Sequence, residues 1–176
     1  ELLDHRNGVF EIRMMETTLS DAVIEHLLRA MAAVGRATTA KVLMIRGSGN
    51  RFLTGAREAH HRAVERKLYR AIAEFPYPVI AVMHGDATGA GFMVAAVCDF
   101  IVCSETANYG FSDAAAGLLP APVQAVFEER FGRTLAADFL YFTPMSTGEA
   151  LRRKGWTCPI VPPEQVDSEA LSLANS

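Results

Sequence analysis

Cysteine is scarce in this sequence of 176 residues, and its few cysteines form no recognisable pattern. Cys98, Cys103 and Cys158 are odd in number, lie among apolar residues and include no Cys-x-x-Cys pair. A disulfide framework is therefore not expected, and the three are predicted to be buried, reduced thiols. His60 and His61 would lie on different faces of a helix with no carboxylate or thiol at helical spacing, so we expect no metal site and no metal cofactor.

The sequence also lacks a basic excess and long hydrophobic runs. A net charge of −3 and a pI near 6.0 provide no positive field for nucleic acid. The longest apolar stretches are much shorter than the roughly 20 residues that cross a bilayer, and the sequence does not begin with a basic segment followed by an apolar one. We therefore expect a cytoplasmic protein that binds neither nucleic acid nor a membrane.

Half of the residues are apolar and 21% are charged, which is typical of one soluble globular domain over residues 1–176. Strand patterns alternate with helix patterns, and the crossovers are long enough for parallel pairing, so the predicted class is α/β. Strands are predicted at 8–14, 41–46, 79–84 and 100–103, and helices at 21–34 (with Asp21 as its cap), 58–75 and 90–97. The last third favours helices at 123–131, 135–142 and 148–154, an apolar run at 158–161 and a helix start at 167–169.

The most informative segment runs from Pro78 to Phe92, where an apolar β-run breaks into a glycine-rich turn and continues as an apolar helix. Such a junction points backbone N–H groups, which have no acceptor within the helix, towards a site where negative charge can develop. The segment 52–57 is a similar loop around Gly55. Two strand ends that each lead through a glycine to a helix predict an oxyanion hole with two donors.

Two nucleotide-binding interpretations fail on the sequence. A dinucleotide fingerprint starting at Gly89 and Gly91 would need a small residue where Val94 stands, and a P-loop would need Gly-Lys-Ser/Thr, which is absent. A structural interpretation stays open, in which the glycines only let a helix pack closely on a strand.

A set of motifs in a fixed order resembles the crotonase (enoyl-CoA hydratase/isomerase) superfamily. They are Phe52-x-x-Gly-Ala56, Pro78-Val-Ile-Ala-Val-x-x-Gly-x-Ala-x-Gly-x-Gly91, Cys98-Asp99, Glu105-x-Ala-x-Tyr-Gly110, Gly117-Leu-Leu-Pro120 and Pro159-Ile-Val-Pro162. The resemblance covers nearly the whole chain. It implies a crotonase-like spiral of ββα repeats with a helical C-terminal part, and a substrate carried as a phosphopantetheine thioester, on coenzyme A or an acyl carrier protein, with no redox or metal cofactor.

The resemblance also implies roles for particular residues. The backbone amides of Ala56 and Ala90 would hold the thioester oxygen, and Gly89 and Gly91 would border the substrate; Ala90 stands where the family usually has glycine. Of the two acids that the hydratases use, the first position is Met93, which cannot move a proton, and the second is Asp113. One carboxylate suits dehydration or isomerisation better than addition of water. The alternative for Asp113 is a turn or cap residue.

Longer strings, including Leu68-Tyr-Arg-Ala-Ile-Ala-Glu-Phe-Pro76 and Gly155-Trp-Thr-Cys-Pro-Ile160, resemble the hydratase homologues of polyketide β-branching. The resemblance implies dehydration of 3-hydroxy-3-methylglutaryl-carrier protein to the 3-methylglutaconyl thioester. The sister branch, which decarboxylates that product, works with a lysine and a histidine instead of an acid at the position of Asp113. An isomerase, a decarboxylase and a non-catalytic binding protein of this fold stay as alternatives.

The distal carboxylate of such a substrate needs a cation or hydrogen-bond donors, and the nearest candidates are Arg57, His60 and His61. Asp86 and His84 are predicted to be structural, and Trp156 to pack in the core or at a subunit contact. Compared with the family, the chain is short between Met14 and Thr17, between Arg57 and Glu58, and after Ser176. We expect C-terminal helices to be missing, and the family resemblance implies a homotrimer or a dimer of trimers.

Overall fold

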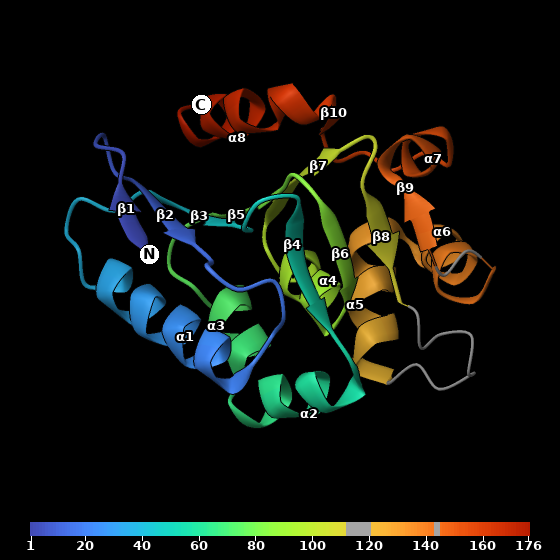
Figure 1. Ribbon diagram of the computed structural model, residues 1–176, viewed down its shortest axis with the longest axis horizontal. Coiled ribbons are helices and arrows are strands. Elements are labelled where there is room, and N and C mark those ends of the chain that lie inside the picture. Colours follow the sequence, from blue (N-terminus) through green and yellow to red (C-terminus); the bar gives the residue numbers. More distant parts are fainter. Residues whose placement is uncertain (112–120, 143–144) are drawn as a thin grey trace.

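The computed structural model describes residues 1–111, 121–142 and 145–176, in which two β-sheets and a set of helices alternate along the chain (Figure 1). The larger sheet has six strands in the order β1-β2-β3-β5-β7-β10, parallel except for β1. Its strands are β1 Leu2–Asp4, β2 Val9–Arg13, β3 Val42–Arg46, β5 Val79–Met83, β7 Phe100–Ser104 and β10 Ile160–Val161.

The smaller sheet has four strands in the order β4-β6-β8-β9, and the first three are parallel. They are β4 Arg51–Gly55, β6 Asp86–Gly89, β8 Asn108–Gly110 and β9 Met145–Thr147. The helices are α1 Asp21–Gly35, α2 Arg57–Glu65, α3 Leu68–Ala73, α4 Ala90–Ala96, α5 Ala121–Phe131, α6 Arg133–Ala137, α7 Gly148–Arg153 and α8 Val166–Ala174, with a π-helical turn over Asp138–Phe142 and a 3₁₀ turn over Pro163–Gln165.

The two sheets are built by the same repeat. A strand of the larger sheet is followed by a strand of the smaller sheet and then by helix, as in β3-β4-α2, β5-β6-α4 and β7-β8-α5. This is the spiral of ββα repeats that the sequence resemblance predicted, and the α/β class is confirmed. In the first two of these repeats, the carboxyl end of a short strand of the smaller sheet lies directly before a helix.

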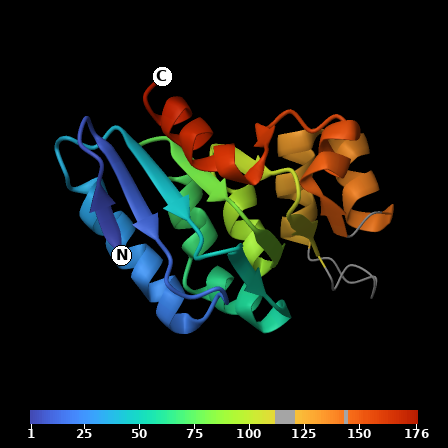
Figure 2. The ribbon, with the colours of Figure 1, turned by 45° about the horizontal axis from the view of Figure 1, so that its top comes forward.

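Helices cover both faces of the larger sheet (Figure 1, Figure 2). On one face lie α1 and α3, with the apolar stripe of α1 buried. On the other face lies α8, whose Val166, Ala170 and Ala174 pack on Val82 and Val102 of the sheet. Parallel strands covered on both faces explain why β5 reads as a continuous apolar run.

An aromatic cluster joins α4 to the helical C-terminal part. The ring of Phe92 contacts the rings of Tyr109, Phe111, Phe127, Phe139 and Trp156. Trp156 is only 5% exposed and stacks on Phe131, with 3.9 Å between ring centroids. Arg130 of α5 donates to the backbone carbonyls of Ala96, Cys98 and Asp99, which bonds α5 to the end of α4. Helix α4 is therefore fixed along its length.

Several predicted elements differ from the structure. The helix expected over 58–75 is two helices, because Lys67 adopts a left-handed conformation with φ of 59° and ends the regular hydrogen bonding. The N-cap of α1 is Ser20, whose side chain accepts from the Val23 amide, and Asp21 is the first helical residue. Two segments that were interpreted as glycine-rich loops contain the strands β4 and β6. Their short, glycine-containing sequences lack the alternation of apolar and polar residues that is typical of a strand.

The cysteines are free thiols, as predicted. The predicted burial is confirmed for Cys98 and Cys103, whereas Cys158 is only half-buried. Burial raises the pKa of the Cys98 thiol to about 12, so this group is an unreactive part of the core.

Candidate active site

Two paired strand ends place the predicted oxyanion residues side by side. Strands β4 and β6 are parallel neighbours, and their last residues, Gly55 and Gly89, are register partners. Ala56 follows Gly55 and is the N-cap of α2, while Ala90 follows Gly89 and is the first residue of α4. The structure thus brings Ala56 and Ala90 together at one edge of the smaller sheet, as the prediction requires. Hydrogen bonding of their amides to a substrate stays a prediction.

The glycines at this edge are needed for close approach of the backbone. Gly89 has a φ of +55°, and a Cβ built on it would lie 2.0 Å from the carbonyl oxygen of Gly55. A Cβ on Gly91 would lie 2.2 Å from the carbonyl oxygen of Leu53. Both distances are far below any real contact, so both positions exclude a side chain. This packing role is the structural alternative raised from the sequence; contact of either glycine with substrate stays a prediction.

His60 and Tyr69 connect the two predicted donor residues. The backbone amide of His60 donates to the carbonyl of Ala56 at 3.2 Å, so His60 lies one helical turn after Ala56. The Nδ1 atom of His60 lies 3.3 Å from the Tyr69 hydroxyl, and that hydroxyl donates to the Ala90 carbonyl at 3.4 Å. The side chains of His60 and Tyr69 therefore connect α2, one turn after Ala56, to the Ala90 carbonyl at the start of α4.

A cavity of about 290 Å³ opens at this point, and most of its wall is apolar. It is lined by His60, Ala63, Val64, Lys67, Tyr69, Arg70, Met93, Val97 and Val126. Met93, at the position where the sequence resemblance places a missing acid, shares this cavity with His60. Cationic side chains come from Lys67 and from Arg70, whose Nε donates to Glu74 at 2.8 Å. The cavity thus has an apolar wall and a basic edge.

Burial controls the protonation of the polar pair. His60 is 7% exposed, and its pKa is lowered first by burial and then by the neighbouring His61. Its imidazole is therefore neutral at neutral pH. Burial raises the pKa of Tyr69 well above its ordinary value, so Tyr69 keeps its proton. The pair consists of a neutral imidazole and a hydroxyl that acts as a donor.

The other predicted residues lie in different settings. Asp113 lies outside the residues that the structure describes. Arg57 is exposed on the first turn of α2, and His61 is exposed beside His60, with 6.1 Å between the ring centroids. Sequence reasoning did not single out Tyr69 or Lys67, because only the turn at Lys67 folds α3 back on α2.

Asp86 and His84 make structural contacts. Asp86 accepts from the Asn108 backbone amide at 2.8 Å, which bonds β6 to β8. His84 follows β5, and its Nε2 lies 2.9 Å from a carboxylate oxygen of Asp167 on α8. These contacts agree with the structural roles that the sequence predicted for both residues.

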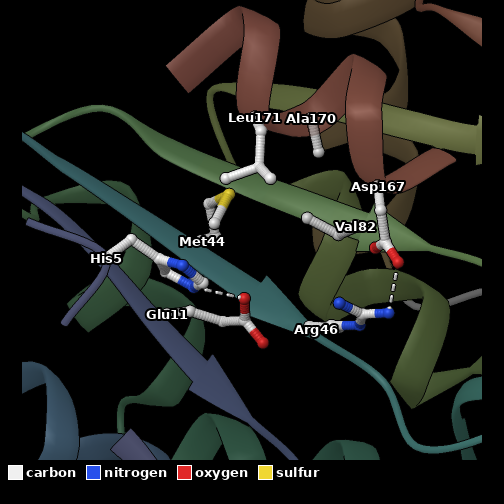
Figure 3. Close-up of a pocket in the computed structure, with 8 residues that line it drawn as sticks. All are labelled: His5, Glu11, Met44, Arg46, Val82, Asp167, Ala170 and Leu171. Atoms are coloured by element: carbon white, nitrogen blue, oxygen red, sulfur yellow. Dashed lines mark hydrogen bonds and ion pairs between the residues drawn. The ribbon is translucent and has the colours of Figure 1, made fainter. Parts of the chain in front are cut away.

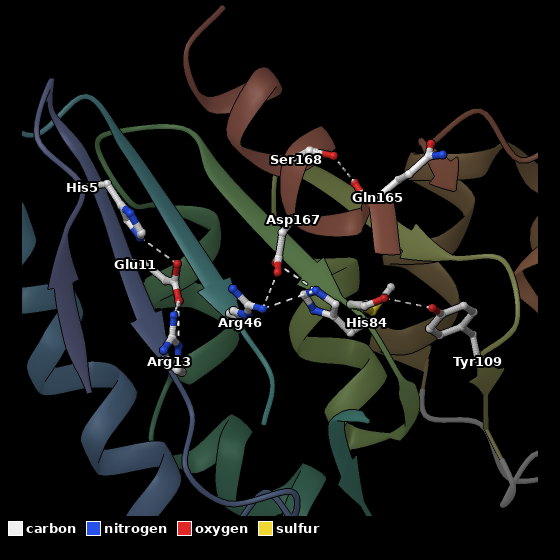
Figure 4. Close-up of polar contacts among 10 residues, drawn as sticks. His5, Glu11, Arg13, Arg46, His84, Tyr109, Gln165, Asp167 and Ser168 are labelled. Atoms are coloured by element: carbon white, nitrogen blue, oxygen red, sulfur yellow. Dashed lines mark hydrogen bonds and ion pairs between the residues drawn. The ribbon is translucent and has the colours of Figure 1, made fainter. Parts of the chain in front are cut away.

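A second, smaller cavity lies on the opposite face of the larger sheet, between β2 and β3 and helix α8 (Figure 3). Its volume is about 130 Å³. It is lined by His5, Glu11, Met44, Arg46, Val82, Asp167, Ala170 and Leu171. The charges in it pair with one another (Figure 4): His5 with Glu11 at 2.7 Å, and Arg46 with Asp167 at 2.6 Å. Because these polar groups satisfy each other, the cluster attaches α8 to the sheet and is no candidate site.

Among residues 1–111, 121–142 and 145–176 no group of three or more His, Cys, Asp and Glu side chains is placed to hold a metal ion. Within the same part of the chain, every helix is too short or too polar to span a membrane.

Comparison with known proteins supports this picture of the fold. The family model described as "Enoyl-CoA hydratase/isomerase" matches residues 4–176. Enoyl-CoA hydratase domain-containing protein 3 of Rattus norvegicus, a mitochondrial protein, is 28% identical over 96% of this chain. The chain spans 60% of the length of that relative.

Two of the similar proteins are decarboxylases. The bacillaene synthase decarboxylase PksI of Bacillus subtilis is 23% identical over 99% of this chain and 75% of its own length. The crystal structure of the ECH2 decarboxylase domain of CurF from Lyngbya majuscula superposes with a TM-score of 0.89 at 26% identity, covering 99% of this chain and 76% of that one.

Proposed function

The chain belongs to the enoyl-CoA hydratase/isomerase family, and from this premise we propose that it is a lyase acting on an acyl thioester. The observation that carries the proposal is the pairing of Gly55 with Gly89, which sets Ala56 and Ala90 next to each other beside an apolar cavity. Members of this family act on acyl thioesters without a metal or redox cofactor. The substrate is an acyl group on phosphopantetheine, attached to coenzyme A or to an acyl carrier protein.

The proposed chemistry develops negative charge on the thioester oxygen. Removing a proton from the α-carbon moves electrons onto that oxygen, and backbone amides aimed at it stabilise the enolate more than the neutral thioester. Ala56 and Ala90 supply these amides in the proposal. Alanine in place of glycine at position 90 keeps the N–H group, and its methyl group is accommodated, since Ala90 is 3% exposed in the packed core.

Dehydration is the preferred reaction. Loss of the α-proton and of the β-hydroxyl group releases one water molecule and leaves an α,β-unsaturated thioester. Asp113 is the proposed acid that protonates the leaving hydroxyl. The proposed substrate is 3-hydroxy-3-methylglutaryl-carrier protein, which would give the 3-methylglutaconyl thioester. In the proposal Arg57 assists by binding the distal carboxylate.

Decarboxylation is the second candidate, and the similarity to PksI and to the CurF domain favours it. In that reaction the distal carboxylate leaves as carbon dioxide, and the same amides stabilise the electrons that remain. An isomerase would move the double bond of the substrate without release of water or carbon dioxide. The family also leaves room for a protein that binds the thioester and does not turn it over.

One experiment separates these outcomes. The purified protein is incubated with hydroxyacyl and enoyl substrates, each supplied on a carrier protein and on coenzyme A, and products are analysed by mass spectrometry in deuterated solvent. We expect loss of water, with carrier-bound substrate preferred. The Asp113→Asn variant should lose about 10²–10⁴-fold in rate, whereas Asp21→Asn, a change at an exposed carboxylate on α1, should not.

The alternatives predict different results. Loss of carbon dioxide would identify the protein as a decarboxylase. Deuterium uptake into a product with the same elemental composition as the substrate would identify it as an isomerase. Binding without turnover, with Asp113→Asn indistinguishable from the unchanged protein, would refute the lyase. A homotrimer or a dimer of trimers, and a cytoplasmic location, stay parts of the proposal.

A further inference from the structure

We propose that His60 is a proton-transfer residue of this active site and that Tyr69 positions it. The inference deepens the lyase proposal and rests on it. It assigns His60 the proton that the family's first acid would move, at a site where this chain has Met93. The backbone bond of His60 to Ala56 and the connection of its ring, through Tyr69, to Ala90 carry the argument.

The first step of the argument is location. His60 lies one turn after Ala56, bonded to its carbonyl, and through the Tyr69 hydroxyl it is linked to Ala90. Its ring lines the apolar cavity that also contains Met93. A substrate whose carbonyl oxygen sits on the Ala56 and Ala90 amides therefore lies beside this imidazole.

The second step concerns the position of the proton on the ring. The Ala90 carbonyl carries no proton, so Tyr69 must donate its single hydroxyl proton to it. The Tyr69 oxygen is then an acceptor for His60, which requires the proton on Nδ1 and leaves the lone pair on Nε2. In the part of the chain that the structure describes, Nε2 has no hydrogen-bond partner. The ring is thus held in the tautomer of a base.

The third step concerns the surrounding charges. The titratable groups around the ring are His61 on the same helix, Tyr69 on α3, and Lys67 and Arg70 at the cavity edge. Each is neutral or positive, and Met93 and Val97 of α4 bring no charge. These surroundings favour a neutral imidazole before reaction. Tyr69 keeps its proton because burial raises its pKa, so it positions the ring and does not exchange protons itself.

The proposed step balances without a further reagent. Nε2 takes the α-proton, the C–H bond breaks, and its electron pair forms the enolate held by the two amides. The enolate then expels the β-hydroxyl group, and the proton that this group needs to leave as water comes from the imidazolium or from a second acid. When the imidazolium supplies it, neutral His60 is regenerated and one water molecule has been released.

The test compares His60→Gln with His26→Gln in the full chain. His26 lies on α1, is not among the residues that line the cavity, and has a pKa that burial lowers, as for His60, so it is a matched control. For each variant we measure turnover of the carrier-bound hydroxyacyl substrate and exchange of the α-proton with deuterated solvent. His60→Gln should lower both by about 10²–10⁴-fold, and His26→Gln should leave both near the level of the unchanged protein.

Tyr69→Phe is the second variant and keeps the proposal testable if His60→Gln folds poorly. Removing one neutral hydrogen bond to the ring should lower kcat up to about tenfold and leave KM unchanged, because only orientation of the base is lost. The rate of the unchanged protein should fall on the acid side with an apparent pKa below the roughly 6.5 of free histidine. Tyr69→Phe should move that limb of the pH profile, which a merely structural tyrosine would not do.

The outcomes separate the two proposals. If the unchanged protein turns over the thioester and His60→Gln matches His26→Gln, the role of His60 is refuted while the lyase stands. If the unchanged protein turns over no acyl thioester, the lyase fails and the role of His60 fails with it. Loss of α-proton exchange in His60→Gln, with circular dichroism unchanged, supports the assignment.

Discussion

Substitution of Gly91 by alanine tests whether the close packing of α4 on β4 determines the position of the Ala90 amide. The added Cβ would lie 2.2 Å from the Leu53 carbonyl oxygen and 2.7 Å from the Leu53 Cβ. Most of the nearby atoms are backbone, so a rotamer change cannot relieve the overlap. To reach an ordinary contact of 3.4 Å, α4 must withdraw from β4 by about 1 Å.

Two magnitudes follow from this displacement. Overpacking of a close-packed core costs about 1–3 kcal/mol of the free energy of unfolding. A shift of about 1 Å in a group that stabilises the transition state can lower the rate by about 10²-fold, and Ala90 precedes Gly91 directly. We therefore expect Gly91→Ala to lower both stability and turnover, with the larger relative effect on turnover.

The assay is urea unfolding followed by circular dichroism, together with turnover of the thioester substrate. Gly35→Ala at the end of α1 is the control, because its Cβ would meet the Phe75 ring at 3.6 Å, an ordinary contact. It should keep activity and gain up to about 1 kcal/mol from helix propensity. A Gly91→Ala protein as stable and as active as Gly35→Ala would refute the argument that this contact positions the Ala90 amide.

Two further predictions concern stability. Burial is the first cause of a lowered pKa for His26, His60 and His84 in the folded chain, so the unfolded chain binds protons more readily than the folded chain. The free energy of unfolding should therefore not depend on these groups well above a pH of about 6.5, and it should decrease as the pH drops below that value. Urea unfolding midpoints at several pH values check this. If the free energy of unfolding of His60→Gln decreased as steeply with falling pH, the contribution assigned to His60 would be contradicted. Phe92→Ala should lower the free energy of unfolding by about 3–5 kcal/mol, because it removes the centre of the aromatic cluster. Phe100→Ala, at a position that is 45% exposed, is the control. Equal losses in the two variants would show that the aromatic cluster is not the main source of this stability.

Inner strands of the larger sheet were predictable from the sequence, because strands buried on both faces read as apolar runs, whereas the largely exposed edge strand β1 was not predicted. Residues 79–84 and 100–103 were both recognised in this way, and they correspond to β5 and β7. The smaller sheet was not found from hydrophobic pattern. Its strand β6 is Asp-Ala-Thr-Gly, a sequence typical of a turn, and it becomes a strand only because β4 and β8 lie on either side of it. Only the family resemblance predicted this second layer.

The candidate site was predictable from the sequence only in part. The local sequence predicted two turns from strand through glycine to helix, and the family resemblance assigned Ala56 and Ala90 to them. Tyr69 was missed because its role depends on a contact between two helices. Nothing in the helical spacing of 58–75 indicates that the chain reverses at Lys67.

That reversal makes the length of the segment between His60 and Tyr69 a structural constraint. In a continuous α-helix, residues nine positions apart would be separated by about 13 Å along the axis. The observed 3.3 Å between the imidazole and the hydroxyl exists only because α2 stops and α3 starts in a new direction after a left-handed residue. Exposed positions in between, such as Glu65 and Arg66, can vary in side chain. Inserting or deleting a single residue there would rotate α3 by about 100° and take the phenol ring away from the imidazole.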